Sequence, residues 1–349
     1  MLPTTFWVIT NYSCNNRCKF CYAADLCAHQ VEPCQDEVMD FNYAKDVLLE
    51  MKNVGAENGL LIGGEPTLYP QLLELISFGA QLGLKMKLVS NGRKLADYNF
   101  VLAIKDAGLV HASISLEAAD AETHNIITQT PSFNESVAGA KNLIRAGISS
   151  NSIMTISLLN HNHIVPLARI MRDAGMNNIL YNFSLPSVNG EEIFDSYSLD
   201  PREYALCITA AYYQLKSEGI KIAFFATLPL CLFPEEILEE MKADKTIGRD
   251  YYCHIYYGTG AAFEPNGNVI PCTHFVNSPL FNAQDEHGKF AYSGKFAAEW
   301  ENGIRKAFIQ EAWHYPNDAC NGCKHWGSCF GGCPFIWMKY KPNGYLERR

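Results

Sequence analysis

One stretch of the chain decides the fold: residues 58–92 read NGLLIGGEPTLYPQLLELISFGAQLGLKMKLVSNG. The short apolar run at 60–62 predicts a strand, and the apolar spacing over 71–82 predicts a helix that Gly83 closes. Residues 85–90 predict the next strand. Two strands joined through a helix in this way run parallel in one sheet.

The same order of strand, helix and glycine recurs about every 30 residues from residue 6 to about residue 225. The other predicted strands cover 6–10, 110–116, 152–158, 179–185 and 220–225. The other predicted helices run from an Asp40 cap to near Gly55 and over 98–107, 134–146, 164–174 and 201–217. About six such units predict an α/β fold, a partial (β/α)6 TIM-like barrel rather than a full eight-unit one.

Length and composition exclude several classes of protein. The 349 residues exceed one average domain, so we expect one large domain and one smaller one. The net charge of −9, without a basic block, argues against a nucleic-acid partner. The N-terminus lacks the basic region of a signal peptide, and the apolar run at 6–9 is too short to cross a bilayer. We therefore expect a cytoplasmic protein with no membrane association.

Thirteen cysteines are many for such a protein, and most of them form two clusters. A reducing compartment disfavours disulfides, so clustered thiols at ligand spacing indicate a metal or iron–sulfur site. Cys207 and Cys231 stand apart and fit the simpler role of buried apolar thiols.

The first motif is Cys14, Cys18 and Cys21 at spacings of four and three residues. Three thiolates can hold a [4Fe–4S] cluster and leave one iron open. An open iron suits direct binding of a cofactor or substrate better than electron transfer, because catalytic metal sites keep a free position. A zinc site or plain loop thiols are the alternatives.

Polar residues follow three successive predicted strands, where parallel barrels place their active sites. Gly63, Gly64, Glu65 and Pro66 follow the second strand, and two glycines there let a ligand approach the backbone. The later strands end on Ser90 with Asn91 and on Ser115 with Glu117. Hydroxyl, amide and carboxylate groups suit a ribose, whereas turn and cap chemistry is the simpler explanation for each residue alone.

Together these motifs resemble the radical S-adenosylmethionine (radical SAM) enzymes, whose hallmark is CxxxCxΦC with an aromatic at Φ, followed by GGEP. The resemblance covers residues 5–225 approximately. It implies that Cys14, Cys18 and Cys21 bind the cluster, whose open iron chelates S-adenosylmethionine. It also implies cofactor contacts from Phe20 and Tyr22 beside adenine, from Gly63, Gly64, Glu65 and Pro66 at the methionyl ammonium, and from Ser90, Asn91, Ser115 and Glu117 at the ribose or carboxylate.

The second cysteine cluster has the spacing of either a structural zinc ribbon or auxiliary iron–sulfur clusters, and spacing alone leaves both open. Behind a radical SAM domain it resembles the SPASM extension, which carries two auxiliary [4Fe–4S] clusters. That resemblance assigns Cys320, Cys323 and Cys329 to an outer cluster and Cys253, Cys272 and Cys333 to an inner one. It predicts a radical SAM barrel over 1–228, a bridge over 229–250 and a small Cys-rich domain over 251–349.

The chain departs from the SPASM pattern, because no cysteine follows Cys333. The outer cluster then has three cysteine ligands. The inner cluster also lacks one unless Cys231 supplies it, with His254 and His274 as weaker candidates.

Cys27 and Cys34 remain, in the loop after the first motif. They are either ordinary loop thiols or hydrogen-atom donors of the kind that an epimerase needs.

SPASM enzymes mostly modify ribosomally made peptides, so the resemblance implies a peptide maturase that forms cross-links or thioethers, or epimerises or oxidises residues. The cluster motif begins at Cys14, which leaves no room for a leader-binding module and implies a separate recognition protein, direct recognition, or a small molecule such as a sugar. A sulfatase maturase ranks low, because Thr273 stands where its aspartate is expected. The electron donor is expected to be an external flavodoxin- or ferredoxin-like protein.

Overall fold

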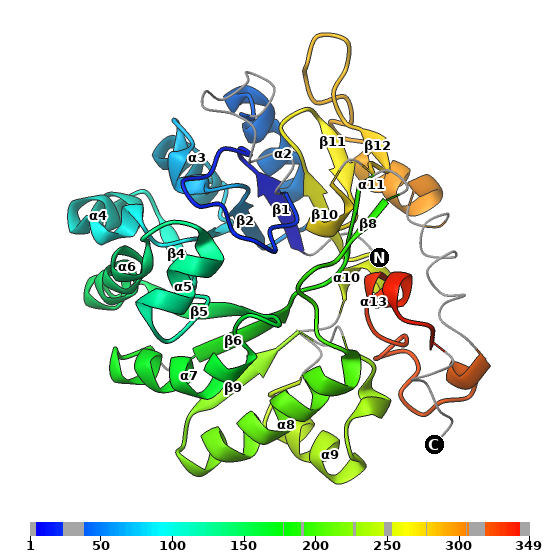
Figure 1. The fold of residues 1–349 in the computed structure, drawn as a ribbon. Coiled ribbons are helices and arrows are strands. Elements are labelled where there is room, and N and C mark those ends of the chain that lie inside the picture. The colour runs from blue at the N-terminus through cyan, green and yellow to red at the C-terminus, as the bar shows by residue number, and fades with distance from the viewer. Residues whose placement is uncertain are drawn as a thin grey trace.

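The fold is described here from a computed structural model, which covers residues 5–23, 38–176, 178–189, 192–225, 228–247, 253–276, 278–304, 306 and 318–342. Within these ranges, ten strands form one sheet in the order β12-β11-β10-β1-β2-β3-β4-β5-β6-β9. The pairs from β10 through β1 to β9 are parallel, whereas β11 and β12 are antiparallel. The sheet curves into an open arc, as the predicted partial barrel requires (Figure 1).

The strands of this sheet are β1 (Thr5–Ile9), β2 (Asn58–Ile62), β3 (Lys85–Ser90), β4 (Leu109–Ser115), β5 (Ser149–Ile156), β6 (Asn178–Phe183), β9 (Lys221–Phe224), β10 (Gly260–Phe263), β11 (Asn268–Ile270) and β12 (Phe281–Asn282). A separate hairpin joins β7 (Ser187–Asn189) to β8 (Glu192–Phe194).

The helices that cover the outside of the arc are α2 (Phe41–Asn53), α3 (Leu72–Gln81), α4 (Tyr98–Asp106), α6 (Phe133–Ala146), α7 (Ile164–Asp173) and α8 (Pro201–Ser217). The remaining helices are α5 (Ala121–Thr128), α9 (Glu235–Ala243) and the short α10 (His254–Tyr257), α11 (Phe296–Glu299) and α13 (Pro334–Lys339). Short 3-10 segments include η2 (Pro66–Leu68), η5 (Leu230–Leu232), η7 (Thr273–Phe275) and η9 (Asp318–Cys320).

Local signals place most of these boundaries. The Asp40 carboxylate accepts hydrogen bonds from the N–H groups of Asn42 (2.9 Å) and Tyr43 (3.0 Å), so α2 begins where the cap was predicted. The predicted helix over 201–217 is confirmed, with Asp200 as its cap. Gly147, at φ 72°, ends α6 in the left-handed conformation that glycine adopts without strain.

Two features were not predicted. Helix α5 is only eight residues long and has a weak apolar pattern, so periodicity does not reveal it. Strand β10 pairs in parallel with β1, which carries the sheet across the predicted domain boundary at residue 251. The side chains of Phe6, Val8 and Phe263 on these two strands are fully buried, so the pairing belongs to the core.

Candidate active site at the strand ends

The loop that carries Cys14, Cys18 and Cys21 follows β1 directly and lies against the end of β2. The N–H groups of Gly64 and Glu65 donate to the carbonyls of Asn11 (2.7 Å) and Ser13 (2.8 Å). A Cβ atom at Gly64 would lie 2.3 Å from the Tyr12 carbonyl oxygen, so only glycine allows this approach. In this structure the glycine pair brings two backbones together, while its contact with a cofactor remains a prediction.

Helix α5, which the sequence did not reveal, supports the other side of this loop. The N–H groups of Arg17 and Lys19 donate to the carbonyls of Thr128 (2.9 Å) and Ile127 (3.0 Å). These carbonyls belong to the last turn of α5, where no intrahelical donor is available. The end of α5 therefore holds the cluster loop in place.

The carboxylate of Glu65 is buried, with 1% exposure, and the protein itself satisfies it. Oε1 accepts from Thr67 N (3.1 Å), Thr67 Oγ1 (2.6 Å) and Ser90 Oγ (2.8 Å), and Oε2 accepts from Asn91 N (2.7 Å). Burial raises the pKa of Glu65, and these donors oppose that rise. The side chain thus ties the end of β2 to the end of β3.

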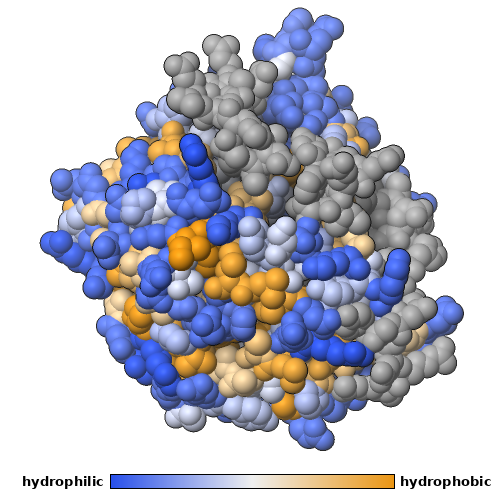
Figure 2. Space-filling view, viewed as in Figure 1, coloured by the Kyte–Doolittle hydropathy of each residue, from blue (hydrophilic) through white to orange (hydrophobic). Residues whose placement is uncertain are grey.

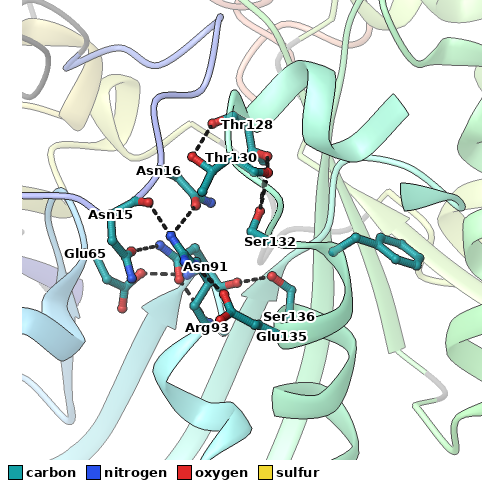
Figure 3. Close-up of polar contacts among 12 residues, drawn as sticks. Asn15, Asn16, Glu65, Asn91, Arg93, Thr128, Thr130, Ser132, Glu135 and Ser136 are labelled. Atoms are coloured by element: carbon teal, nitrogen blue, oxygen red, sulfur yellow. Dashed lines mark hydrogen bonds and ion pairs between the residues drawn. The ribbon is translucent and has the colours of Figure 1, made fainter. Parts of the chain in front are cut away.

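Asn91 and Arg93 hold the cluster loop from the end of β3 (Figure 3). Asn91 Nδ2 donates to Asn15 Oδ1 (2.7 Å) and lies 4.0 Å from Cys14 Sγ. Arg93 Nη1 donates to the Asn15 carbonyl, and Arg93 Nε donates to Glu135 of α6 (2.5 Å). No spacing rule along the chain points to Arg93, because its partners come from two other segments.

Glu117, just past β4, is also buried and has a different environment. Its Oε2 accepts from Thr155 N (2.9 Å), and its own N–H donates to His124 Nδ1 (3.2 Å). Burial raises the pKa of Glu117 to about 8 and lowers that of His124 to about 4. When ionised, Glu117 raises the pKa of Cys18, so this carboxyl lies near the cluster loop. Ser115 ends β4 and is half-buried.

The three cysteines of the first motif are neighbours, since each acts electrostatically on another. Burial raises the pKa of Cys14 to about 12 and that of Cys18 well above its usual value. The Asn16 N–H points at Cys14 Sγ (3.4 Å), a contact that stabilises a thiolate. Buried thiols with such donors suit metal binding, because a coordinating metal removes the thiol proton.

Within the part of the chain that the structure describes, no three His, Cys, Asp or Glu side chains converge closely enough to hold a single ion. A [4Fe–4S] cluster bonds each thiolate to a different iron, so its ligands need not converge on one atom. The thiols of the first motif fit that chemistry, and their ligand role remains a prediction.

The aromatic residues of the motif region connect it to the C-terminal segment. The Tyr22 hydroxyl donates to the Gly63 carbonyl (3.4 Å), and the Tyr22 ring lies 5.8 Å from the ring of His274. His274 lies 5.7 Å from the ring of Phe335 in α13. Burial lowers the pKa of His274 to about 4, so its imidazole is neutral. Phe20 is half-buried in the loop, whereas Cys27 and Cys34 lie outside the described residues.

The C-terminal cysteines form two groups. The inner group comprises Cys253, Cys272 and Cys333, and the first two act electrostatically on Cys333. Each of these cysteines directly precedes a short helix, α10, η7 or α13. Burial raises the pKa of all three thiols, and the backbone N–H groups of the second and third residues of each helix oppose that rise. Such N–H groups stabilise a thiolate, so the inner group also has the chemistry of metal ligands.

The outer group comprises Cys320, Cys323 and Cys329, which line one pocket together with Cys231. The structure does not place Cys231 with the inner group. Cys231 lies in η5, which brings it to the pocket lined by the outer group. His254, a weaker candidate for the missing ligand of the inner cluster, forms a hydrogen bond with Thr259 Oγ1 (3.0 Å) and packs on the ring of Trp7.

Comparison with known proteins identifies the relatives of this chain. The sequence model of the Radical SAM superfamily matches residues 8–189, which is more than half of the chain. The AdoMet-dependent heme synthase of Methanosarcina barkeri is 27% identical over 76% of this chain and 75% of its own length. Mycofactocin maturase MftC of Mycobacterium tuberculosis is 24% identical over 94% of this chain and 77% of its own length.

Solved structures show the same fold over nearly the whole chain. Streptococcus suis SuiB bound to S-adenosylmethionine has a TM-score of 0.70 and 17% identity, covering 99% of this chain and 76% of SuiB. The structure of anSMEcpe with bound AdoMet has a TM-score of 0.70 and 16% identity, covering 98% of this chain and 92% of that protein. Of the helices in the described ranges, none combines the length and apolar character needed to cross a bilayer.

Proposed function

Because the chain belongs to the radical SAM superfamily, we propose that it modifies a ribosomally made peptide through a cross-link, a thioether, an epimerisation or an oxidation. It is an enzyme of this superfamily, whose cofactors are S-adenosylmethionine and a [4Fe–4S] cluster. These cofactors supply a one-electron cleavage of S-adenosylmethionine and a 5′-deoxyadenosyl radical that removes a hydrogen atom from substrate.

In this proposal the residues of the chain bind and orient the cofactors. Cys14, Cys18 and Cys21 hold the cluster. Glu65 and Arg93 fix the cluster loop against β3 through the hydrogen bonds described above. Cofactor contacts are assigned to Phe20, Tyr22, Gly63, Gly64, Glu65, Pro66, Ser90, Asn91, Ser115 and Glu117.

The observation that carries the peptide substrate is the likeness to mycofactocin maturase MftC, which spans 94% of this chain. The fold supports it, since a SuiB structure bound to the precursor peptide SuiA matches all of this chain with a TM-score of 0.71. Figure 2 shows hydrophobic residues gathered near the middle of the face viewed in Figure 1, where apolar peptide side chains would find a contact surface. An external flavodoxin- or ferredoxin-like donor and a separate leader-recognition protein complete the proposal.

A small-molecule substrate is the second candidate. An AdoMet-dependent heme synthase is 27% identical over 76% of this chain, against 24% for MftC, and a probable GTP 3′,8-cyclase is 28% identical over 49% of this chain. Both names describe enzymes that act on small molecules. A dehydrogenase or epimerase of a small molecule therefore remains the alternative.

The test begins with the anaerobically reconstituted full chain, dithionite and S-adenosylmethionine. We expect 5′-deoxyadenosine and about twelve irons per chain, the content of three [4Fe–4S] clusters. The Cys14/Cys18/Cys21→Ala triple variant should contain about eight irons and form no 5′-deoxyadenosine. The Cys207→Ala variant, which alters a cysteine outside all three groups, should match the unmodified protein. A wild-type protein with no iron and no 5′-deoxyadenosine would refute the proposed chemistry.

The substrate class is tested with any short peptide that is encoded beside the gene. A mass change in one of these peptides, accompanied by increased 5′-deoxyadenosine, supports the peptide maturase. Unchanged peptides together with a modified sugar or tetrapyrrole would favour the second candidate instead.

A further inference from the structure

Four cysteines from two distant parts of the chain line one pocket. Cys231 lies in η5, between the barrel and the C-terminal segment, while Cys320, Cys323 and Cys329 lie about 90 to 100 residues later. Both Cys231 and Cys320 act electrostatically on Cys329, so the three sulfurs are near one another. Cys231 and the outer group thus form a set of four thiols.

The backbone beside Cys231 is fastened to this set. The N–H of Leu230 donates to Cys329 Sγ (3.2 Å). An N–H group directed at a sulfur stabilises a thiolate, and such hydrogen bonds accompany cluster ligands.

A second attachment holds the two segments together. Glu235, at the start of α9, pairs with Lys324 (2.7 Å), which follows Cys323. Glu235 Oε2 also lies 3.6 Å from Nε2 of the buried His325. The segment that contains Cys231 is therefore anchored on both sides to the loop that contains the outer group.

Cys207, which belongs to none of the cysteine groups, is the comparison for the surroundings of Cys231. It lies in α8 on the barrel surface, where its charged neighbour is the carboxylate of Glu203. Cys231 is half-buried like Cys207, yet its neighbours are other thiols.

We propose that Cys231 is the fourth thiolate of the outer auxiliary cluster. This inference rests on the proposed function, which supplies the iron–sulfur chemistry. The outer cluster is then closed by four cysteines, the arrangement typical of electron transfer. The inner group keeps three described cysteines, and the fourth iron there is left for another ligand.

The first test needs no variant. Cys231 and Cys207 are alkylated with iodoacetamide in the anaerobic holoprotein and in the iron-free protein, and peptide mapping by mass spectrometry follows each site. We expect the cluster to slow labelling of Cys231 by about tenfold or more, because a coordinated thiolate is a poor nucleophile. Cys207 should react equally in both forms. Equal labelling of Cys231 in both forms would overturn the proposal.

The second test counts iron and sulfide in Cys231→Ala and in the control Cys207→Ala after a chelator wash. We expect Cys231→Ala to retain about four irons fewer than wild type, and Cys207→Ala to match wild type. About twelve irons in both wild type and Cys231→Ala would refute the role of Cys231 and leave the proposed function intact. About eight irons and one zinc in the wild type would replace the outer cluster by a zinc site. A wild type without iron would instead refute the proposed function itself.

Discussion

Two buried carboxyl side chains lie beside the cluster loop and differ in the number of hydrogen bonds that they accept. Glu65 has four donors from the protein, whereas Glu117 has one backbone donor, Thr155 N–H. A buried carboxylate without enough donors is costly, so burial raises the pKa of Glu117 to about 8. At neutral pH the Glu117 carboxyl is therefore mostly protonated in the iron-free protein.

Glu117 should make the stability of the iron-free protein depend on pH. The pKa of Glu117 in the folded protein lies above its ordinary value of 4.5. The protonated Glu117 side chain therefore stabilises the fold fully below pH 4.5, and this contribution is lost as the pH rises through about 8. Between pH 6 and pH 9 we expect the free energy of unfolding to fall by about 2–3 kcal/mol more in the wild type than in Glu117→Gln. Urea unfolding at both pH values measures this difference.

The matched control is Glu122→Gln, which alters an exposed carboxylate in the first turn of α5. It should keep the wild-type pH dependence. Identical pH dependence in wild type and Glu117→Gln would mean that Glu117 is ionised throughout this range.

Among the elements, the cluster loop depends on α5, β3 and α6 for its position. Arg93 connects the cluster loop, the end of β3 and α6, because its guanidinium bonds both the loop carbonyl of Asn15 and the Glu135 carboxylate. A planar guanidinium can serve two acceptors in fixed directions, whereas an ammonium group acts as a single point charge. The sequence predicted the strand end at Ser90 but not this connection, since it depends on how α6 packs.

We expect Arg93→Lys to loosen the cluster loop without unfolding the barrel. In the reconstituted protein, a chelator should remove iron about fivefold faster, the equivalent of ~1 kcal/mol in the opening of the loop. The control is Arg169→Lys, which weakens a similar pair between Arg169 of α7 and Glu218 at the end of α8 (2.5 Å). If both variants lose iron at the wild-type rate, Arg93 does not hold the loop.

At the scale of the whole molecule, a strand from the C-terminal part of the chain pairs with the first strand. Strand β1 pairs with β2 on one side and with β10, some 250 residues later, on the other. Gly260 of β10 makes this possible, because a Cβ there would lie 2.6 Å from Cζ3 of Trp7 and 2.7 Å from Cβ of His254. The N-terminal and C-terminal parts should therefore unfold together.

Gly260→Ala tests this closure. The added methyl must displace Trp7 or His254 in a packed interior, and we expect it to lower the free energy of unfolding by about 1–3 kcal/mol. Gly303→Ala is the control, because a Cβ at that exposed position meets no atom within 4 Å. Urea unfolding of the iron-free protein, followed by tryptophan fluorescence and far-UV circular dichroism, gives both values. Equal stability of the two variants would show that β10 is not packed firmly on β1.

The sequence by itself determined the features that depend on residues close together in the chain. The alternation of strand, helix and glycine predicted the parallel sheet, because apolar periodicity and capping act over a few residues. The spacing of Cys14, Cys18 and Cys21 likewise predicted a cluster loop, and these three thiols are neighbours in the structure.

Only the tertiary structure decided how distant segments meet. It placed β10 beside β1 and brought Leu230 to Cys329, 99 residues away, which assigns Cys231 to the outer group. Such contacts follow from the curvature of the sheet and the packing of the whole chain, which leave no periodic signal in the sequence. The cysteine count was therefore known from the sequence, but the grouping of the cysteines depended on the fold.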